Sequence, residues 1–286
     1  MSYKIVVDSC CDLTADMKNW DNLEVIPLTL QIGDYVIPDD ENFNQDDFVN
    51  RMINSDVLAQ SACPSPQAFA DACCCEADDI YIITITSHLS GCYNSAVQGV
   101  ALYKDENGDN KNIHVFNSLA TSGVETLIAM EIKKLADAGK DFSQVVETVE
   151  GFITNNSGLY FCLESFDILK GNGRLFNLAA NVIEALRVKL IGHAENGKIA
   201  IAGKDLTIKR TLIKLSHLIA KDTEGADLSN KLCIISHVCC EEKAKAIKEL
   251  IASNTNYQES NIIILRASGL NSLYASNSGV IVSFNY

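Results

Sequence analysis

A polar turn that joins an apolar run to a helical pattern is the part of this sequence best suited to chemistry. Residues 80–85 read IYIITI, which is typical of a buried parallel strand, and the polar residues from Ser87 to Gly91 end that run. Apolar residues return at helical spacing from Tyr93. A helix that begins near Ser90 has backbone N–H groups without intrahelical partners, and the positive end of its dipole points at the turn. The junction therefore predicts a site for a carboxylate or a phosphate.

Ser90 also has a simpler interpretation, in which its hydroxyl only caps the helix that follows. A second polar turn bears on this choice. Residues 61–66 read SACPSP, so a turn with two prolines brings the hydroxyls of Ser61 and Ser65 just ahead of another expected helix. Two hydroxyl-bearing turns of this kind favour a ligand site over capping alone.

The two turns, together with the opening KIVVDSCCDLT, resemble the DegV family over essentially the whole chain. Residues 7–13, VDSCCDL, are similar to the family's T-D-S-x-x-D-L, and residues 61–65 are similar to T-S-Q-P-S. Residues 89–96, LSGCYNSA, resemble L-S-G-T-Y-x-S-A. Members of this family are bacterial fatty-acid-binding proteins and include the lipid-carrying subunit of fatty acid kinase. The resemblance implies that this chain binds a long-chain fatty acid.

The resemblance also implies which residues hold the ligand. The family's hydroxyls at the positions of Ser61 and Ser90 hydrogen-bond the fatty acid carboxylate. Tyr274 stands where kinase-linked members have a histidine that helps to hold the carboxylate. A phenol can donate one hydrogen bond, but it cannot become cationic as imidazole can, so the resemblance is compatible with binding and leaves the handling of an acyl phosphate open.

Arg174 is the residue that the resemblance places toward a kinase partner. It lies in residues 169–175, LKGNGRL, which are similar to the family's L-x-K-G-G-R-I. The alternative is an arginine that covers a turn built on Gly171 and Gly173. Sequence alone leaves both interpretations of Arg174 open.

Composition agrees with a globular binding protein inside the cell. The 286 residues suggest two domains, and 47% of them are hydrophobic. A net charge of -14 argues against nucleic acid or an anionic membrane surface as a partner. No apolar run is long enough to span a membrane and no export signal is recognisable, so a cytoplasmic location is expected. The 11 cysteines lack C-x-x-C spacing, and we expect thiols rather than a metal site or disulfides.

The order of the expected elements predicts an α/β protein of two domains, residues 1–157 and 158–286. Strands are expected at residues 4–8, 23–32, 80–86, 113–117, 198–202, 231–236, 262–266 and 279–284. Helices are expected at residues 67–75, 93–102, 122–138, 142–155, 178–186, 207–223 and 241–253. The first domain should contain a largely parallel sheet with helices on both faces, and residues 34–54 should form an excursion outside its core. The resemblance implies that the second α/β domain packs on the first and that the acyl chain lies in an apolar tunnel between or beneath them.

The expected function is thus that of a lipid carrier, without catalytic residues, metal or cofactor other than the fatty acid, that presents its ligand to a kinase. The alternative is an enzyme, or the substrate-binding component of a small-molecule kinase, related to dihydroxyacetone kinase. His88, beside Ser90, would be the nearest acid or base. A serine hydrolase is less favoured because Ser90 lacks the G-x-S-x-G elbow. A purely structural or interaction protein would need neither hydroxyl turn.

Overall fold

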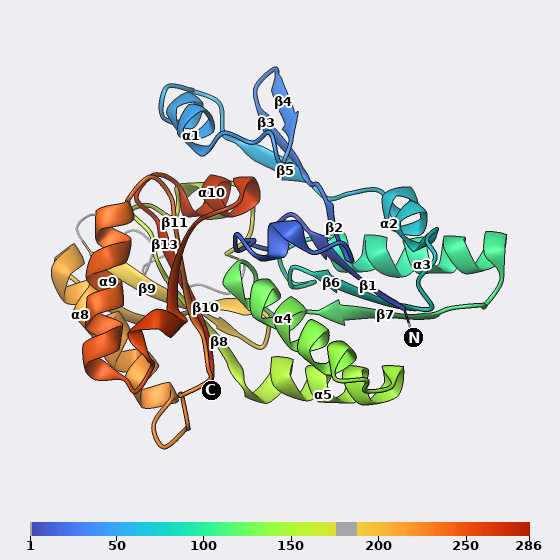
Figure 1. The fold of residues 1–286 in the computed structure, drawn as a ribbon. Helices are drawn as coiled ribbons and strands as arrows, with labels where there is room; N and C mark the ends of the chain where they lie inside the picture. The colour runs from blue at the N-terminus through green and yellow to red at the C-terminus, as the bar shows by residue number, and fades with distance from the viewer. Residues whose placement is uncertain (1, 176–187) are drawn as a thin grey trace.

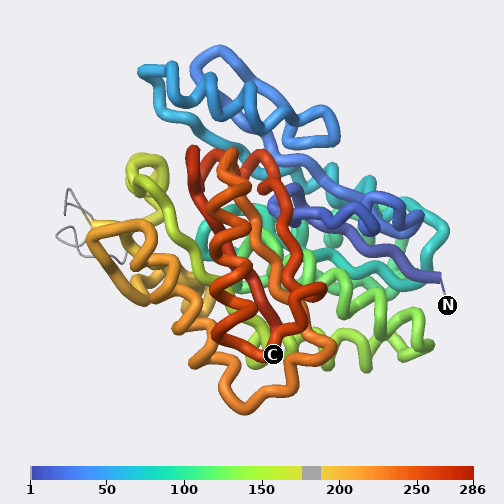
Figure 2. Tube along the Cα trace, turned by 60° about the vertical axis from the view of Figure 1, so that its left-hand side comes forward, coloured from blue at the N-terminus to red at the C-terminus, as the bar shows by residue number. Residues whose placement is uncertain are grey.

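The computed structural model describes residues 2–175 and 188–286, which form two large sheets and one small sheet with helices packed on them (Figures 1 and 2). The parallel sheet has the order β2-β1-β6-β7 and contains β1 (Tyr3–Asp8), β2 (Leu23–Ile26), β6 (Asp79–Thr84) and β7 (Asn112–Asn117). The six-stranded sheet has the order β10-β9-β8-β13-β11-β12 and contains β8 (Ser157–Cys162), β9 (Lys189–Glu195), β10 (Lys198–Asp205), β11 (Cys233–His237), β12 (Ile262–Arg266) and β13 (Val280–Asn285). The small antiparallel sheet contains β3 (Thr29–Ile32), β4 (Tyr35–Pro38) and β5 (Gln60–Ala62).

The helices are named in the same chain order. They are α1 (Gln45–Ile53), α2 (Pro66–Cys73), α3 (Cys92–Asn107), α4 (Gly123–Asp137), α5 (Phe142–Asn155), α6 (Asp167–Gly171), α8 (Ile208–Asp222), α9 (Glu241–Asn254) and α10 (Gly269–Ala275). Two short 3₁₀ helices cover Met17–Asn19 and Glu259–Asn261. The helix expected at residues 178–186 lies outside the described residues.

The parallel sheet is covered by helices on both faces, as the sequence predicted. Val6 and Ile82 point to the side of α2 and α3, whereas Ile5 and Ile83 point to the side of α4 and α5. Alternate side chains along one strand are therefore buried on opposite faces, which is why the central residues of β1 and β6 are apolar. The fold class is confirmed for the described residues.

Helix α4 connects the two large sheets. It packs against β1 and β6 of the parallel sheet and against β13 of the six-stranded sheet. At Gly123, where the helix starts, an added Cβ would lie 2.9 Å from Ile234 and from Ser283, so only glycine allows this approach. The other face of the six-stranded sheet carries α8 and α9 (Figure 1).

Three expectations from the sequence need correction. Residues 23–32 form two strands rather than one, because Pro27 has no N–H group to donate and the chain passes there from the parallel sheet to the small sheet. Residues 34–54 contain β4 and α1 and bury Phe48 and Val49 in the core. Strands β8 and β9 were not expected. The proposed domain boundary between residues 157 and 158 stays a prediction.

Helices α2 and α3 touch at Gly99, and this contact makes a first prediction. A Cβ at Gly99 would lie 2.5 Å from the carbonyl oxygen of Pro66 and 2.6 Å from the Cβ of Phe69. We expect Gly99→Ala to lower the free energy of unfolding by about 1–3 kcal/mol because the helices must separate. Urea denaturation would measure the loss. Gly151→Ala in α5 is the matched control, since nothing lies within 4 Å of its position; equal stability of the two variants would contradict the prediction.

Candidate functional site

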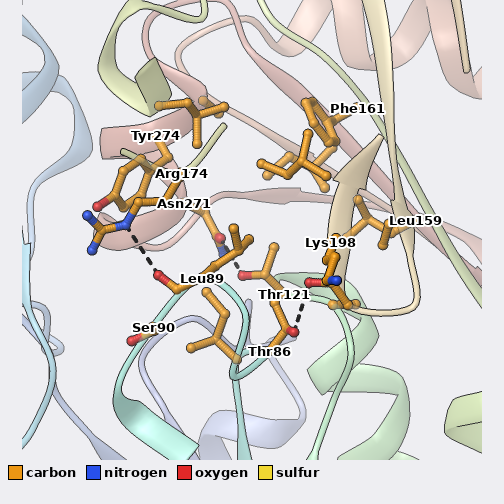
Figure 3. A pocket seen from close by; sticks show the side chains of 18 of the residues that line it. Thr86, Leu89, Ser90, Thr121, Leu159, Phe161, Arg174, Lys198, Asn271 and Tyr274 are labelled. Carbon is orange, nitrogen blue, oxygen red and sulfur yellow. Dashed lines mark hydrogen bonds between the residues drawn. The ribbon is translucent and has the colours of Figure 1, made fainter. Parts of the chain in front are cut away.

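A cavity lies where the turns that follow β6 and β7 meet the six-stranded sheet (Figure 3). Its empty space, counted together with the solvent at its open side, is about 810 Å³. Most of its wall is apolar, with side chains that include Leu119, Leu159, Phe161, Leu163, Ile199 and Ile281. Ser61, Ser90, Arg174 and Tyr274 also line it, so all four site residues predicted from the sequence face one cavity. Their roles are not tested by this placement.

Ser90 lies in the turn between β6 and α3. Its hydroxyl accepts a hydrogen bond from the N–H of Cys92 at 3.2 Å and donates one to the Cys92 sulfur at 3.1 Å. Gly91 occupies the N-cap position of α3 and makes no side-chain cap. Ser90 thus satisfies one donor of the helix and still reaches the cavity, so the two interpretations made from the sequence are compatible. Burial raises the pKa of the Cys92 thiol, which keeps this neighbour of Ser90 uncharged.

Ser61 and Tyr274 meet although 213 residues separate them. The Ser61 Oγ and the Tyr274 Oη are 3.1 Å apart, and either can donate the hydrogen bond. Ser61 is on β5 and Tyr274 is on α10. The small sheet, to which β5 belongs, connects these two elements. The carboxyl group of Asp39 accepts the N–H groups of Gly269 and Leu270 at the start of α10, each at 2.8 Å. Asp39 is therefore one of the residues that hold α10, and with it Tyr274, against the small sheet.

Arg174 lies beside the same group of hydroxyls. Its guanidinium carbon is 5.8 Å from the centre of the Tyr274 ring, and its Nε donates to the Leu89 carbonyl oxygen at 3.2 Å. It also donates to the carbonyl oxygen of Asn172, in the turn that follows α6. Arg174 therefore covers this turn, as the alternative interpretation held, and adds a positive charge beside Ser90 and Tyr274.

Four further polar residues that the sequence reasoning missed line the cavity: Thr121, His193, Lys198 and Asn271. Thr121 donates to the Asn271 Oδ1 at 3.0 Å, and the Asn271 amide donates to the Cys10 carbonyl oxygen at 2.7 Å and to the Asp12 Oδ1 at 3.0 Å. Asn271 lies in the same stretch, residues 269–278, from which the resemblance identified Tyr274. The resemblance of that stretch was therefore the feature of the sequence that could have indicated Asn271. Thr121 carries no pattern in the sequence that distinguishes it from other threonines.

His88 is exposed and lies outside the group of side chains that line the cavity. Its backbone N–H donates to the Thr86 hydroxyl at 3.3 Å, and Thr86 in turn donates to the carbonyl oxygen of Gly197 at 2.9 Å. Thr86 therefore connects the turn after β6 to the hairpin between β9 and β10.

A buried acidic group lies beneath the strand ends, apart from the cavity. Ligand-type atoms of Asp8, Cys10 and Glu125 all lie within 4.8 Å of one another. Asp8 accepts the N–H groups of Cys10 and Ile85, both at 2.9 Å, and holds the carboxyl ends of β1 and β6 together. Burial and the nearby Asp8 raise the pKa of Glu125 well above its usual value. Burial therefore favours the protonated form of Glu125, whose two carboxyl oxygens have no hydrogen-bond partner among the described residues.

The comparisons with known proteins now identify the family. The sequence model described as "Uncharacterised protein, DegV family" matches residues 2–279. This chain belongs to the DegV family. A DegV domain-containing protein of Streptococcus pyogenes serotype M3 is 34% identical to it over 291 residues, which cover 99% of each protein. One of Streptococcus gordonii is 31% identical over 288 residues, with the same coverage.

Solved DegV structures share the fold. A DegV protein of Ruminococcus gnavus, refined with vaccenic acid, superposes with a TM-score of 0.93 at 37% identity and covers 99% of each chain. The Fatty Acid Kinase (Fak) B3 protein of Streptococcus pneumoniae, loaded with linoleic acid, superposes with a TM-score of 0.88 at 29% identity and covers 100% of this chain and 99% of its own. A DegV protein of Eubacterium eligens, loaded with heptadecanoic acid, gives a TM-score of 0.87 at 26% identity over 99% of each chain.

Two further properties of this DegV protein concern its cysteines and its helices. All 11 cysteines are free thiols. Within residues 2–175 and 188–286, the helices are too short or too polar for any of them to cross a bilayer.

Proposed function

We propose that this DegV protein binds a long-chain fatty acid, with the acyl chain in the cavity and the carboxylate at the hydroxyls of Ser61, Ser90 and Tyr274. The observation that carries the proposal is the convergence of these three hydroxyls on one end of a cavity whose remaining wall is mostly apolar. The fatty acids bound to the DegV structures of Ruminococcus gnavus and Eubacterium eligens support the same ligand class.

The chemistry at the two ends of the cavity suits an amphipathic ligand. A carboxylate is a strong acceptor for hydroxyl donors, and the start of α3 and the Arg174 guanidinium add positive potential in a protein whose net charge is -14. Each methylene buried in the cavity contributes about 0.8 kcal/mol to binding. The chain therefore supplies most of the affinity, and the hydroxyls orient the ligand.

The role proposed is that of a carrier rather than an enzyme. The Fak B3 protein is a structural neighbour over the whole chain, which supports a kinase as the partner. The resemblance of residues 169–175 to the family's motif is the ground for Arg174 as the residue on the partner's side. The free thiols support a cytoplasmic location. The cavity wall draws on both proposed domains, residues 1–157 and 158–286, so the ligand would contact both.

Lipid analysis of the purified protein tests the proposal. Native mass spectrometry, followed by denaturing extraction, should find about one fatty acid per chain. Ser90→Ala should weaken binding roughly 10- to 150-fold, the loss expected when one hydrogen bond to a charged group is removed. A displacement titration with oleate would measure it.

Ser87→Ala is the matched control because Ser87 is in the same turn but bonds to Asn117 and does not line the cavity. A wild-type protein that neither carries nor takes up a fatty acid would refute the proposed function. Wild-type affinity in Ser90→Ala would refute the site.

A further inference from the structure

We propose that the pair of Phe161 and Gly192 sets the length of acyl chain that the cavity accepts. This inference rests on the proposed function and adds a determinant of specificity to it. Phe161 on β8 and Gly192 on β9 are direct partners across the two antiparallel strands. Phe161 lines the cavity, and Figure 3 places it across the cavity from Ser90, so it is at the end that the tail of the chain would reach.

The Phe161 ring can keep its position only because residue 192 has no side chain. A Cβ added to Gly192 would lie 2.1 Å from the Cζ and 2.4 Å from the Cε2 of Phe161, so the tip of the ring rests directly on the Gly192 backbone. The ring is 7% exposed and its centre is 6.1 Å from that of Phe166. It forms part of the wall instead of occupying the space in front of it.

A side chain at residue 192 would have to displace this ring. The strands of the sheet lie on one side of the Phe161 ring, and Phe166 lies on another. A densely packed interior can move only slightly to make room for the ring. Phe161 lines the cavity, so the ring has open space on that side and would turn into it. Residue 192 therefore controls the depth of the cavity without touching the ligand, and the ring of Phe161 is the surface that the chain end meets.

The same sheet contains a second pair of this kind that does not face the cavity. Gly158 on β8 and Phe284 on β13 are also cross-strand partners, and a Cβ at Gly158 would lie 2.4 Å from the Phe284 Cζ. Phe284 is fully buried in the core beneath α8 and α9. The two pairs share their packing chemistry and differ in what lies in front of the ring, so Gly158 provides an internal control.

Displacement of a bound fluorescent fatty acid by myristate and by stearate tests the inference. The quantity compared between variants is the ratio of the two dissociation constants. Gly192→Ala should weaken stearate relative to myristate about tenfold, as expected when two methylenes lose their place in the cavity. Phe161→Leu should shift the ratio in the opposite direction. The double variant Gly192→Ala/Phe161→Leu should return toward the wild-type ratio, because the clash no longer exists.

Gly158→Ala should lower stability and leave the ratio unchanged. If Gly192→Ala does not fold, Phe161→Leu and the double variant still decide the matter. An unchanged ratio in these variants, with stoichiometric binding by the wild type, would overturn the inference alone. Absence of binding by the wild type would overturn the proposed function, and this inference with it.

Discussion

Asp12→Ala should lower the free energy of unfolding by about 3–5 kcal/mol, the loss expected when one side of a buried polar network is removed. Asp12 is 1% exposed. Its carboxyl group accepts the N–H of Ser268 at 2.7 Å, the amide of Asn271 at 3.0 Å and the hydroxyl of Ser122. The variant would remove one acceptor from Ser122 and from Asn271, which keep Ser236 and the Cys10 carbonyl oxygen as partners, and would leave the Ser268 N–H without its acceptor.

Thermal and urea denaturation would measure this loss, with a fall in Tm on the order of 10 °C. Asp12→Asn keeps one acceptor oxygen and should lose less. Asp21→Ala is the surface control, since Asp21 is exposed. A melting temperature of Asp12→Ala close to that of Asp21→Ala would show that the network does not contribute the expected stability.

Asp39 should make the protein less stable as the pH rises from about 4 to about 7. Burial raises the pKa of Asp39 to about 7, although the N–H groups of Leu270 and Gly269 act in the opposite direction. An aspartate in an unfolded chain has a pKa of about 3.9. Between these two values the folded state holds a proton that the unfolded state has released, so the stabilisation is complete below pH 4 and is lost as the pH rises through 7.

The Asp39→Asn variant isolates this effect from that of the other carboxyl groups. Its free energy of unfolding, relative to the wild type, should increase by about 3 kcal/mol between pH 4.5 and pH 8, because asparagine has no proton to lose. Urea denaturation at several pH values would measure the difference. Parallel curves for the two proteins would contradict a raised pKa at Asp39.

The parallel sheet could be predicted from the sequence because its strands are buried on both faces. Runs such as residues 80–85 have no other plausible place in a globular protein. The same reasoning missed β8, whose six residues SGLYFC follow α5 after a single asparagine and carry no turn signal of their own. Strands with clear ends were predictable, and a strand that follows a helix without a turn signal was not.

The site was predictable to the extent that its residues sit in local patterns. Ser61 and Ser90 precede helices, and the turn chemistry alone indicated them. Tyr274 required the family resemblance, because its contact with Ser61 depends on the docking of α10. Asp39 could not be found from its neighbours: it lies in a polar segment and is buried only because two N–H groups more than 200 residues away turn toward it. Whether a polar residue such as Asp39 is buried depends on the distant segment that packs against it, so its neighbours in the sequence do not reveal it.

The wall of the cavity comes from segments spread between Ser61 and Ile281, and this has a consequence for the order of folding. No single local unit of the chain can form the cavity, so it must appear late, after the parallel sheet and the six-stranded sheet have each formed and docked through α4. Contacts that are this distant in sequence are slow to form. Until then the apolar side chains of the future wall face water, and newly made chains are most exposed to aggregation during that interval.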